Sequence, residues 1–166
     1  LTLHENGLID ANLYLTKVKT DLKPLAGMQL DLLNIEDWHK LDDLEPLRGM
    51  PLQKLLMPEC FEVTDLGPLK GMPLTSLSMP HCRKVSDLEP LRGMPLEGLN
   101  CEDTAVTDFG PLAGMPLKRL AASACTVADL SPLRGLPLES LILSSAAIRD
   151  LEPLRGCAGV TPAAIG

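Results

Sequence analysis

Aromatic residues are almost absent from this sequence. Phe, Trp and Tyr make up 2% of the 166 residues, whereas hydrophobic residues make up 45%. A chain of this length holds enough apolar side chains for one core. Leucine, valine, methionine and alanine therefore have to fill that core.

Positive charge is also scarce, and long apolar runs are missing. Fifteen Lys and Arg residues stand against 22 Asp and Glu residues, which gives a formal net charge of −7. This balance argues against a nucleic-acid partner or an anionic membrane surface, because both require clustered cations. No run of about 18 apolar residues occurs, so no segment is expected to span a membrane. The first ten residues lack the basic and apolar regions of a signal peptide.

The cysteines show no pairing pattern. The five, at positions 60, 82, 101, 125 and 157, are odd in number and widely spaced, unlike a disulfide framework. We expect reduced, buried thiols and a cytoplasmic location. A zinc site at Cys60, Cys82 and His81 is the alternative, but zinc needs four ligands and His81 is expected to face away from the thiols. We therefore predict thiols that pack in the core, with no metal site and no cofactor.

Catalytic motifs are missing as well. No G-x-S-x-G, Walker A or H-E-x-x-H pattern occurs, and the only histidines are His4, His39 and His81. None of the glycines lies in a phosphate-binding run. The sequence predicts a protein without enzymatic activity.

What the sequence does contain is one repeated phrase. The decapeptide DLEPLRGMPL occupies residues 43–52 and returns unchanged at 87–96. Related units follow one another at a spacing of 22 residues three times and then 21 residues three times. A fixed period in this range is typical of a solenoid, in which each unit stacks on its neighbour. The units begin at Asp21, Asp43, Asp65, Asp87, Asp108, Asp129 and Asp150.

The period divides the chain into three parts. We expect residues 1–20 to form an irregular N-terminal cap or partial repeat, and residues 21–149 to form six repeats. Residues 150–166 are expected to form a truncated repeat and a tail. Because this tail of small residues provides no polar cap, we expect a fragment, a disordered end, or an end that another chain covers, as in an end-to-end dimer.

Each unit begins with a turn that its own residues specify. Asp accepts the free N–H groups of a first helical turn, and Pro three residues later fits that turn because it has no N–H to leave unpaired. Gly then ends the turn in a left-handed conformation, and the residue before the next Pro favours extended backbone. Capping accounts for one Asp per unit, so a calcium ladder, which needs denser oxygen ligands, is not expected.

The second half of each unit reads L-x-x-L-x-L or a close variant, as in Leu52, Leu55 and Met57. The last two apolar positions alternate with an exposed residue, which is the period of a strand. One unit cannot bury its apolar side alone. Stacked units can, with strands about 4.8 Å apart in a parallel sheet.

These frames resemble the leucine-rich repeat family, and the short period resembles its compact class. The phrase DLxPLxGMPLxxL is also similar to bacterial repeats that accompany serine/threonine kinase domains. The resemblance implies an α/β fold: a right-handed solenoid with a concave parallel β-sheet, short 3₁₀ or α turns on the convex side, and partner binding on the concave face.

One position departs from this family pattern. The family often places an inward Asn after the strand, where it satisfies backbone groups of the loop. Trp38 cannot do this in the same way, so a distorted first repeat is expected. The residues at this position are Trp38, Cys60, Cys82, Thr104, Cys125 and Ala146.

Candidate binding residues occupy the outward strand positions and the strand ends, where residue types vary from unit to unit. Acidic residues gather at the strand ends of the early units, and small or apolar residues gather in the last ones. This pattern predicts a protein or peptide partner with a basic contact region. The predicted concave-face residues are Asn34, Glu36, Asp37, Lys54, Leu56, Glu59, Ser78, His81, Asn100, Glu102, Asp103, Arg119, Ala121 and Ile142.

Three functions remain open at this point. The first is a non-catalytic protein–protein interaction module that binds its partner on the concave face. The second is a regulatory or substrate-recruiting segment of a larger signalling enzyme, such as a serine/threonine kinase. The third is a structural spacer.

Overall fold

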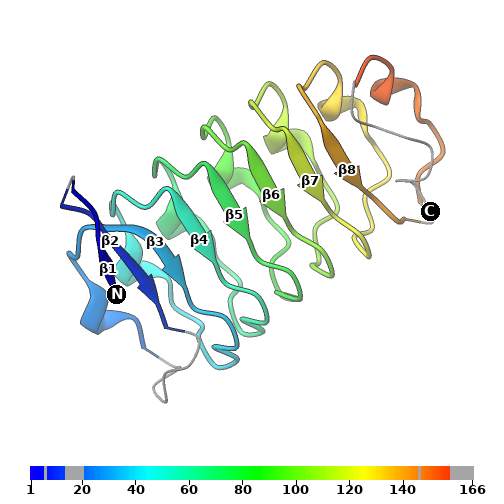
Figure 1. The fold of residues 1–166 in the computed structure, drawn as a ribbon. Coiled ribbons are helices and arrows are strands. Elements are labelled where there is room, and N and C mark those ends of the chain that lie inside the picture. The colour runs from blue at the N-terminus through cyan, green and yellow to red at the C-terminus, as the bar shows by residue number, and fades with distance from the viewer. Residues whose placement is uncertain (6, 14–20, 146, 158–166) are drawn as a thin grey trace.

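The computed structural model describes residues 1–5, 7–13, 21–145 and 147–157. In these residues, eight strands form one sheet in the order of the sequence (Figure 1). The first two strands pair antiparallel, and every later pair is parallel. The strands are β1 Thr2–Leu3, β2 Ile9–Asn12, β3 Leu30–Asn34, β4 Lys54–Leu56, β5 Ser76–Ser78, β6 Gly98–Asn100, β7 Arg119–Ala121 and β8 Ser140–Ile142.

The six strands predicted from the leucine frames are β3 to β8. Two further strands, β1 and β2, precede them in the segment predicted to be an irregular cap. Because β2 pairs in parallel with β3, the repeat sheet begins one strand earlier than the sequence indicates. Ala146 and the tail after Cys157 lie outside the described residues.

The convex side consists of 3₁₀ turns of three residues each, which Figure 1 shows on the side away from the sheet. No helix in the described ranges is long and apolar enough to cross a membrane. The turns are η1 Lys23–Leu25, η2 Glu45–Leu47, η3 Gly67–Leu69, η4 Glu89–Leu91, η5 Gly110–Leu112, η6 Ser131–Leu133 and η7 Glu152–Leu154.

Each turn is started by its Asp, but from one residue earlier than an N-cap. Oδ1 of the Asp accepts the N–H two residues on, at 2.6 to 2.8 Å in all seven units. This is an Asx-turn, and the residue between the two partners takes the N-cap position. In η2 that residue is Leu44, which is buried. The predicted capping chemistry is present, and its one-residue offset lets Leu44 join the core.

The core lies between the sheet and the turns, and strand alternation decides which side chains enter it. In β4, Lys54 is exposed, Leu55 is fully buried and Leu56 is half-buried. Leu55 pairs with Leu77, and Leu77 pairs with Leu99, so the leucines stack in register along the solenoid. The predicted period-2 pattern is confirmed.

The first repeat is irregular as expected, because the pairing of β2 with β3 shifts register next to Asp10, but Trp38 is not the cause. The indole is buried, and its Nε1 donates to the carbonyl of Leu13 at 3.4 Å. At the same position of the next unit, the Cys60 thiol donates to the carbonyl of Ile35 at 3.5 Å. Both acceptors belong to the preceding turn of the solenoid. The indole N–H therefore does what the thiols do elsewhere, and β3 pairs in register with β4.

Candidate functional site

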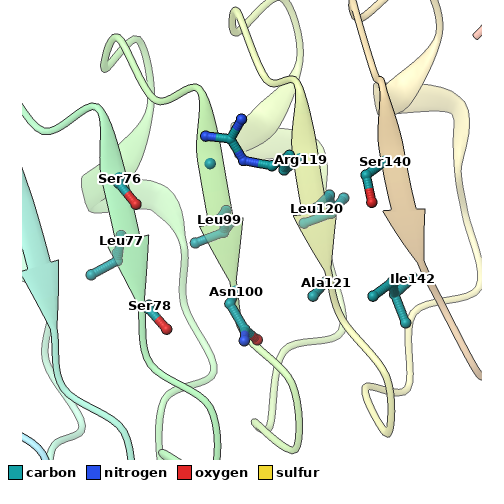
Figure 2. Close-up of a pocket in the computed structure, with 11 residues that line it drawn as sticks. Ser76, Leu77, Ser78, Leu99, Asn100, Arg119, Leu120, Ala121, Ser140 and Ile142 are labelled. Carbon is teal, nitrogen blue, oxygen red and sulfur yellow. The ribbon is translucent and has the colours of Figure 1, made fainter. Parts of the chain in front are cut away.

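A shallow hollow of about 270 Å³ lies on the concave face of β5 to β8. Figure 2 shows the side chains that line it, which come from all four strands. Its volume is below the range of about 300–1,000 Å³ that is usual for small-molecule pockets. The hollow is therefore suited to one or two protruding side chains of a partner.

The hollow exists because β6 begins with a glycine. A methyl group at Gly98 would lie 3.5 Å from Nη2 of Arg119 and 3.7 Å from Oγ of Ser76. With no side chain there, the guanidinium of Arg119 reaches over β6 from the neighbouring strand (Figure 2). The exposed Arg119 makes no ion pair with any described residue. Its donors are available to a carboxylate or carbonyl of another molecule.

Two rows of side chains cross the sheet at the hollow. One row joins Ser76, Gly98, Arg119 and Ser140, and it is polar with one cation. The second row changes from polar to apolar. It runs through Ser78, Asn100, Ala121 and Ile142.

The apolar end of the second row is exposed. Ile142 keeps 52% of its surface accessible, and it is one of the few large hydrophobic residues exposed to this degree. An exposed apolar side chain beside a cation and several hydroxyl groups is a combination that interfaces use for anchoring and orientation.

Six predicted surface residues lie after the strands and not on them, and four of these six have a left-handed backbone. Asp37, Glu59, His81 and Asp103 follow the strands, with positive φ values of 62°, 61°, 63° and 50°. Their placement on outward strand positions is wrong, because the repeat strands end before them. Asp and His tolerate this left-handed conformation better than most residues. The turn directs these side chains to one edge of the sheet.

We call this edge the rim, defined by Asp37, His39, Glu59, Phe61, His81, Arg83 and Asp103. The rings of His39 and Phe61 stack with centroids 4.7 Å apart. The guanidinium carbon of Arg83 lies 5.9 Å from the Phe61 ring centroid. Three successive units thus contribute one ring or one guanidinium each to a continuous column.

The acidic residues of the rim are largely paired. Nδ1 of His81 lies 2.9 Å from Oδ2 of Asp103, and Nε of Arg83 donates to the same oxygen at 2.8 Å. Hydrogen bonds from His81 and then Arg83 lower the pKa of Asp103 below its usual value. Nε2 of His39 lies 3.3 Å from Oε2 of Glu59. The rim therefore presents less unpaired negative charge than the sequence predicts.

The structure divides the predicted binding residues into two groups. Sequence reasoning missed His39, Phe61 and Arg83, although they recur two residues after the left-handed position of each unit. The residues on strands are Asn34, Lys54, Leu56, Ser78, Asn100, Arg119, Ala121 and Ile142, and those after strands are Glu36, Asp37, Glu59, His81, Glu102 and Asp103.

Four of the five cysteines, all except Cys157, are buried in the core and do not belong to this surface. Cys60 and Cys82 are unpaired and fully buried. Burial raises the pKa of each thiol to about 12. Because the thiolate is the nucleophile, a thiol with such a pKa is inert near neutral pH.

Iodoacetamide at pH 8 should therefore leave Cys60 and Cys82 unmodified in the native protein. Both should react once the chain is unfolded in urea, because unfolding removes the burial that raises their pKa. Peptide mass spectrometry measures the modification. Cys157, which is half-buried, serves as the internal control and should react faster in the native protein. Rapid native modification of Cys82 would contradict the burial described here.

Comparison with known proteins gives structural matches only. No protein-family model and no curated protein matches the sequence. Internalin C2 from Listeria monocytogenes strain 4b F2365 is 27% identical and superposes with a TM-score of 0.74, over 84% of this chain and 63% of that chain. Internalin F from the same strain is 29% identical, with a TM-score of 0.75 over 85% of this chain and 43% of that chain.

This chain spans less than two thirds of either internalin. Both matches cover more than four fifths of this chain, in whose described residues parallel strands alternate with 3₁₀ turns. The fold of this chain is that of a leucine-rich-repeat solenoid.

Proposed function

We propose that this chain is a non-catalytic module that binds a protein partner on the concave face of β5 to β8. The hollow beside Gly98 carries the proposal, since it joins Arg119, which has no ion-pair partner among the described residues, to the exposed Ile142. The likeness to internalins, which share the solenoid fold, supports an interaction role.

The chemistry of the hollow favours a partner segment with two features. A carboxylate or a pair of carbonyl oxygens would accept the guanidinium donors of Arg119. A small apolar side chain would cover Ala121 and Ile142, where burial of apolar surface provides affinity. Asn100 is already oriented, because its Oδ1 accepts the N–H of Glu102 at 3.0 Å. Its amide nitrogen remains as a further donor.

The expected basic contact region fits a different part of the surface. Glu36 and Glu102 follow their strands and form no ion pair with any described residue. A basic segment of the partner would lie there, beside the paired charges of the rim. The proposed partner is therefore bipolar, with an acidic or amide-rich tip in the hollow and a basic flank along the strand ends.

A catalytic role is not favoured by the same surface. The His81–Asp103 pair, 2.9 Å apart, is an arrangement that orients a general base. However, Arg83 donates a hydrogen bond to the same carboxylate oxygen of Asp103. Within the described ranges, no hydroxyl or thiol is hydrogen-bonded to His81. Without a nucleophile the pair is a structural contact between adjacent units.

Site-specific photo-crosslinking tests the proposed face. A benzophenone amino acid at Ser140 should crosslink to a distinct protein in the source cells, whereas the same group at Ser131 on the convex side should not. Arg119→Glu should then weaken binding of that protein by about tenfold or more, since interface arginines are frequent hot spots. Isothermal titration calorimetry measures the change.

A matched charge reversal on the convex side, Lys70→Glu, should leave the affinity unchanged. Binding that survives both Arg119→Glu and Ile142→Asp would contradict the proposal and favour a spacer. The recruiting segment of a larger signalling enzyme would use the same face. The mass of the native gene product distinguishes that role from an independent module.

A further inference from the structure

Three metal-ligating side chains meet at the N-terminal end of the sheet, away from the concave hollow. His4 follows β1, Asp10 lies in β2 and Asp31 lies in β3. Their Nε2, Oδ1 and Oδ1 atoms all lie within 4.8 Å of one another. All three atoms are shielded from solvent, and none has a hydrogen-bond partner. Shielded polar atoms without partners are rare in folded proteins, so the cluster requires an explanation.

A β-bulge brings Asp31 into this cluster. Ile9 pairs with Leu30, but the next residue, Asp10, pairs with Leu32, so Asp31 is an extra residue in β3. The later pairs of strands in the described sheet keep a regular register. Bulges redirect side chains and are common next to functional sites. The departure from regular pairing therefore coincides with the three unpaired atoms.

A hydrogen bond does not account for the short contact in the cluster. Nε2 of His4 lies 2.9 Å from Oδ1 of Asp10, yet neither atom has a hydrogen bond. Two atoms that bind the same metal ion also lie close together without a hydrogen bond between them. Each points at an ion about 2.0–2.2 Å away, which places neighbouring ligand atoms roughly 3 Å apart and side by side.

The charges and atom types favour a divalent transition metal. Two half-buried carboxylates whose shielded oxygens face each other repel, and a dication neutralises both. One imidazole nitrogen with two carboxylate oxygens suits Zn²⁺ or a related first-row ion. Ca²⁺ and Mg²⁺ take oxygen ligands and fit the imidazole poorly. Three protein ligands leave a coordination position for water.

We infer that His4, Asp10 and Asp31 bind a divalent ion of the zinc class, and that this ion fastens the N-terminal strand to the first repeat. β1 has two residues, both exposed, and within the described sheet it pairs only with β2. Figure 1 shows β1, β2 and β3 side by side at this end. An ion held by one ligand from each of these three segments joins them more firmly than two backbone pairs do.

Titration of the untagged, metal-stripped chain with ZnCl₂ tests the site. Calorimetry should show one Zn²⁺ bound per chain, and Zn²⁺ should raise the thermal midpoint and slow proteolysis before β2. CaCl₂ should do neither. His4→Ala and Asp31→Asn should each weaken Zn²⁺ binding by about tenfold or more. Asp31→Asn nearly preserves the side-chain shape, so circular dichroism should confirm that it folds.

The matched control is His39→Ala, which removes the histidine of the exposed Asp37–His39–Glu59 group on the rim. This variant should bind Zn²⁺ as the unchanged chain does. Absence of saturable Zn²⁺ binding would overturn the proposal, and so would binding that is lost in His39→Ala but retained in His4→Ala. Zinc that binds through His4 without slowing proteolysis before β2 would overturn the fastening role.

Discussion

Leu77→Ala should lower the free energy of unfolding by about 2–5 kcal/mol, the range found for buried leucines truncated to alanine. Leu77 is 1% exposed and lies in β5, near the middle of the sheet. Its strand partners Leu55 and Leu99 are buried as well. Truncation removes apolar burial and also leaves a cavity that stacked neighbours cannot close. Urea denaturation followed by circular dichroism measures the loss.

The matched control is the next residue along the same strand. Ser78 is half-buried and faces the concave side. Ser78→Ala should therefore change the free energy of unfolding by less than about 0.5 kcal/mol. Similar losses for Leu77→Ala and Ser78→Ala would contradict the strand phase, because a shift of one residue exchanges the two faces.

The repeat strands were predictable because the residues that determine the local conformation recur in each unit. The left-handed Gly, the Pro inside the turn and the alternation around Leu55 recur with the period, so one correct reading applies to every unit. Gly49, Gly71 and Gly93 have φ of 72°, 76° and 74°, as the phrase predicts. Repetition turns a weak local signal into a strong one.

The rim and the N-terminal cluster could not be predicted in the same way. The residues that adopt a left-handed conformation at the rim, such as His81, are not glycines. The rim therefore has no counterpart of the repeated glycine that identifies each convex turn in the sequence. The sequence predicts a free surface residue at Asn100, yet its Oδ1 accepts the N–H of Glu102. His4, Asp10 and Asp31 follow no period at all. They meet because of a β-bulge in β3, and no pattern in the sequence predicts that bulge.

The last prediction concerns the glycine that ends each convex turn. Gly93→Val should lower the free energy of unfolding by about 2–3 kcal/mol, because β-branched residues strongly resist positive φ. Gly93 has φ +74°, and a methyl group there would meet no atom within 4 Å. The expected loss is therefore conformational and does not come from a clash with neighbouring units. Urea denaturation again provides the measurement.

Two further substitutions distinguish the cost of a left-handed backbone from the general effect of replacing a glycine. Gly93→Asn should cost less than Gly93→Val, since Asn visits the left-handed region more readily. Gly98→Ala should be nearly neutral, because Gly98 does not have positive φ and the added methyl group would make only ordinary contacts, the nearest at 3.5 Å. If Gly93→Val and Gly98→Ala cost the same, the left-handed turn is not what requires glycine. If they differ as expected, the repeated Gly sets the turn, whereas Gly98 can be varied to fill the hollow without disturbing the fold.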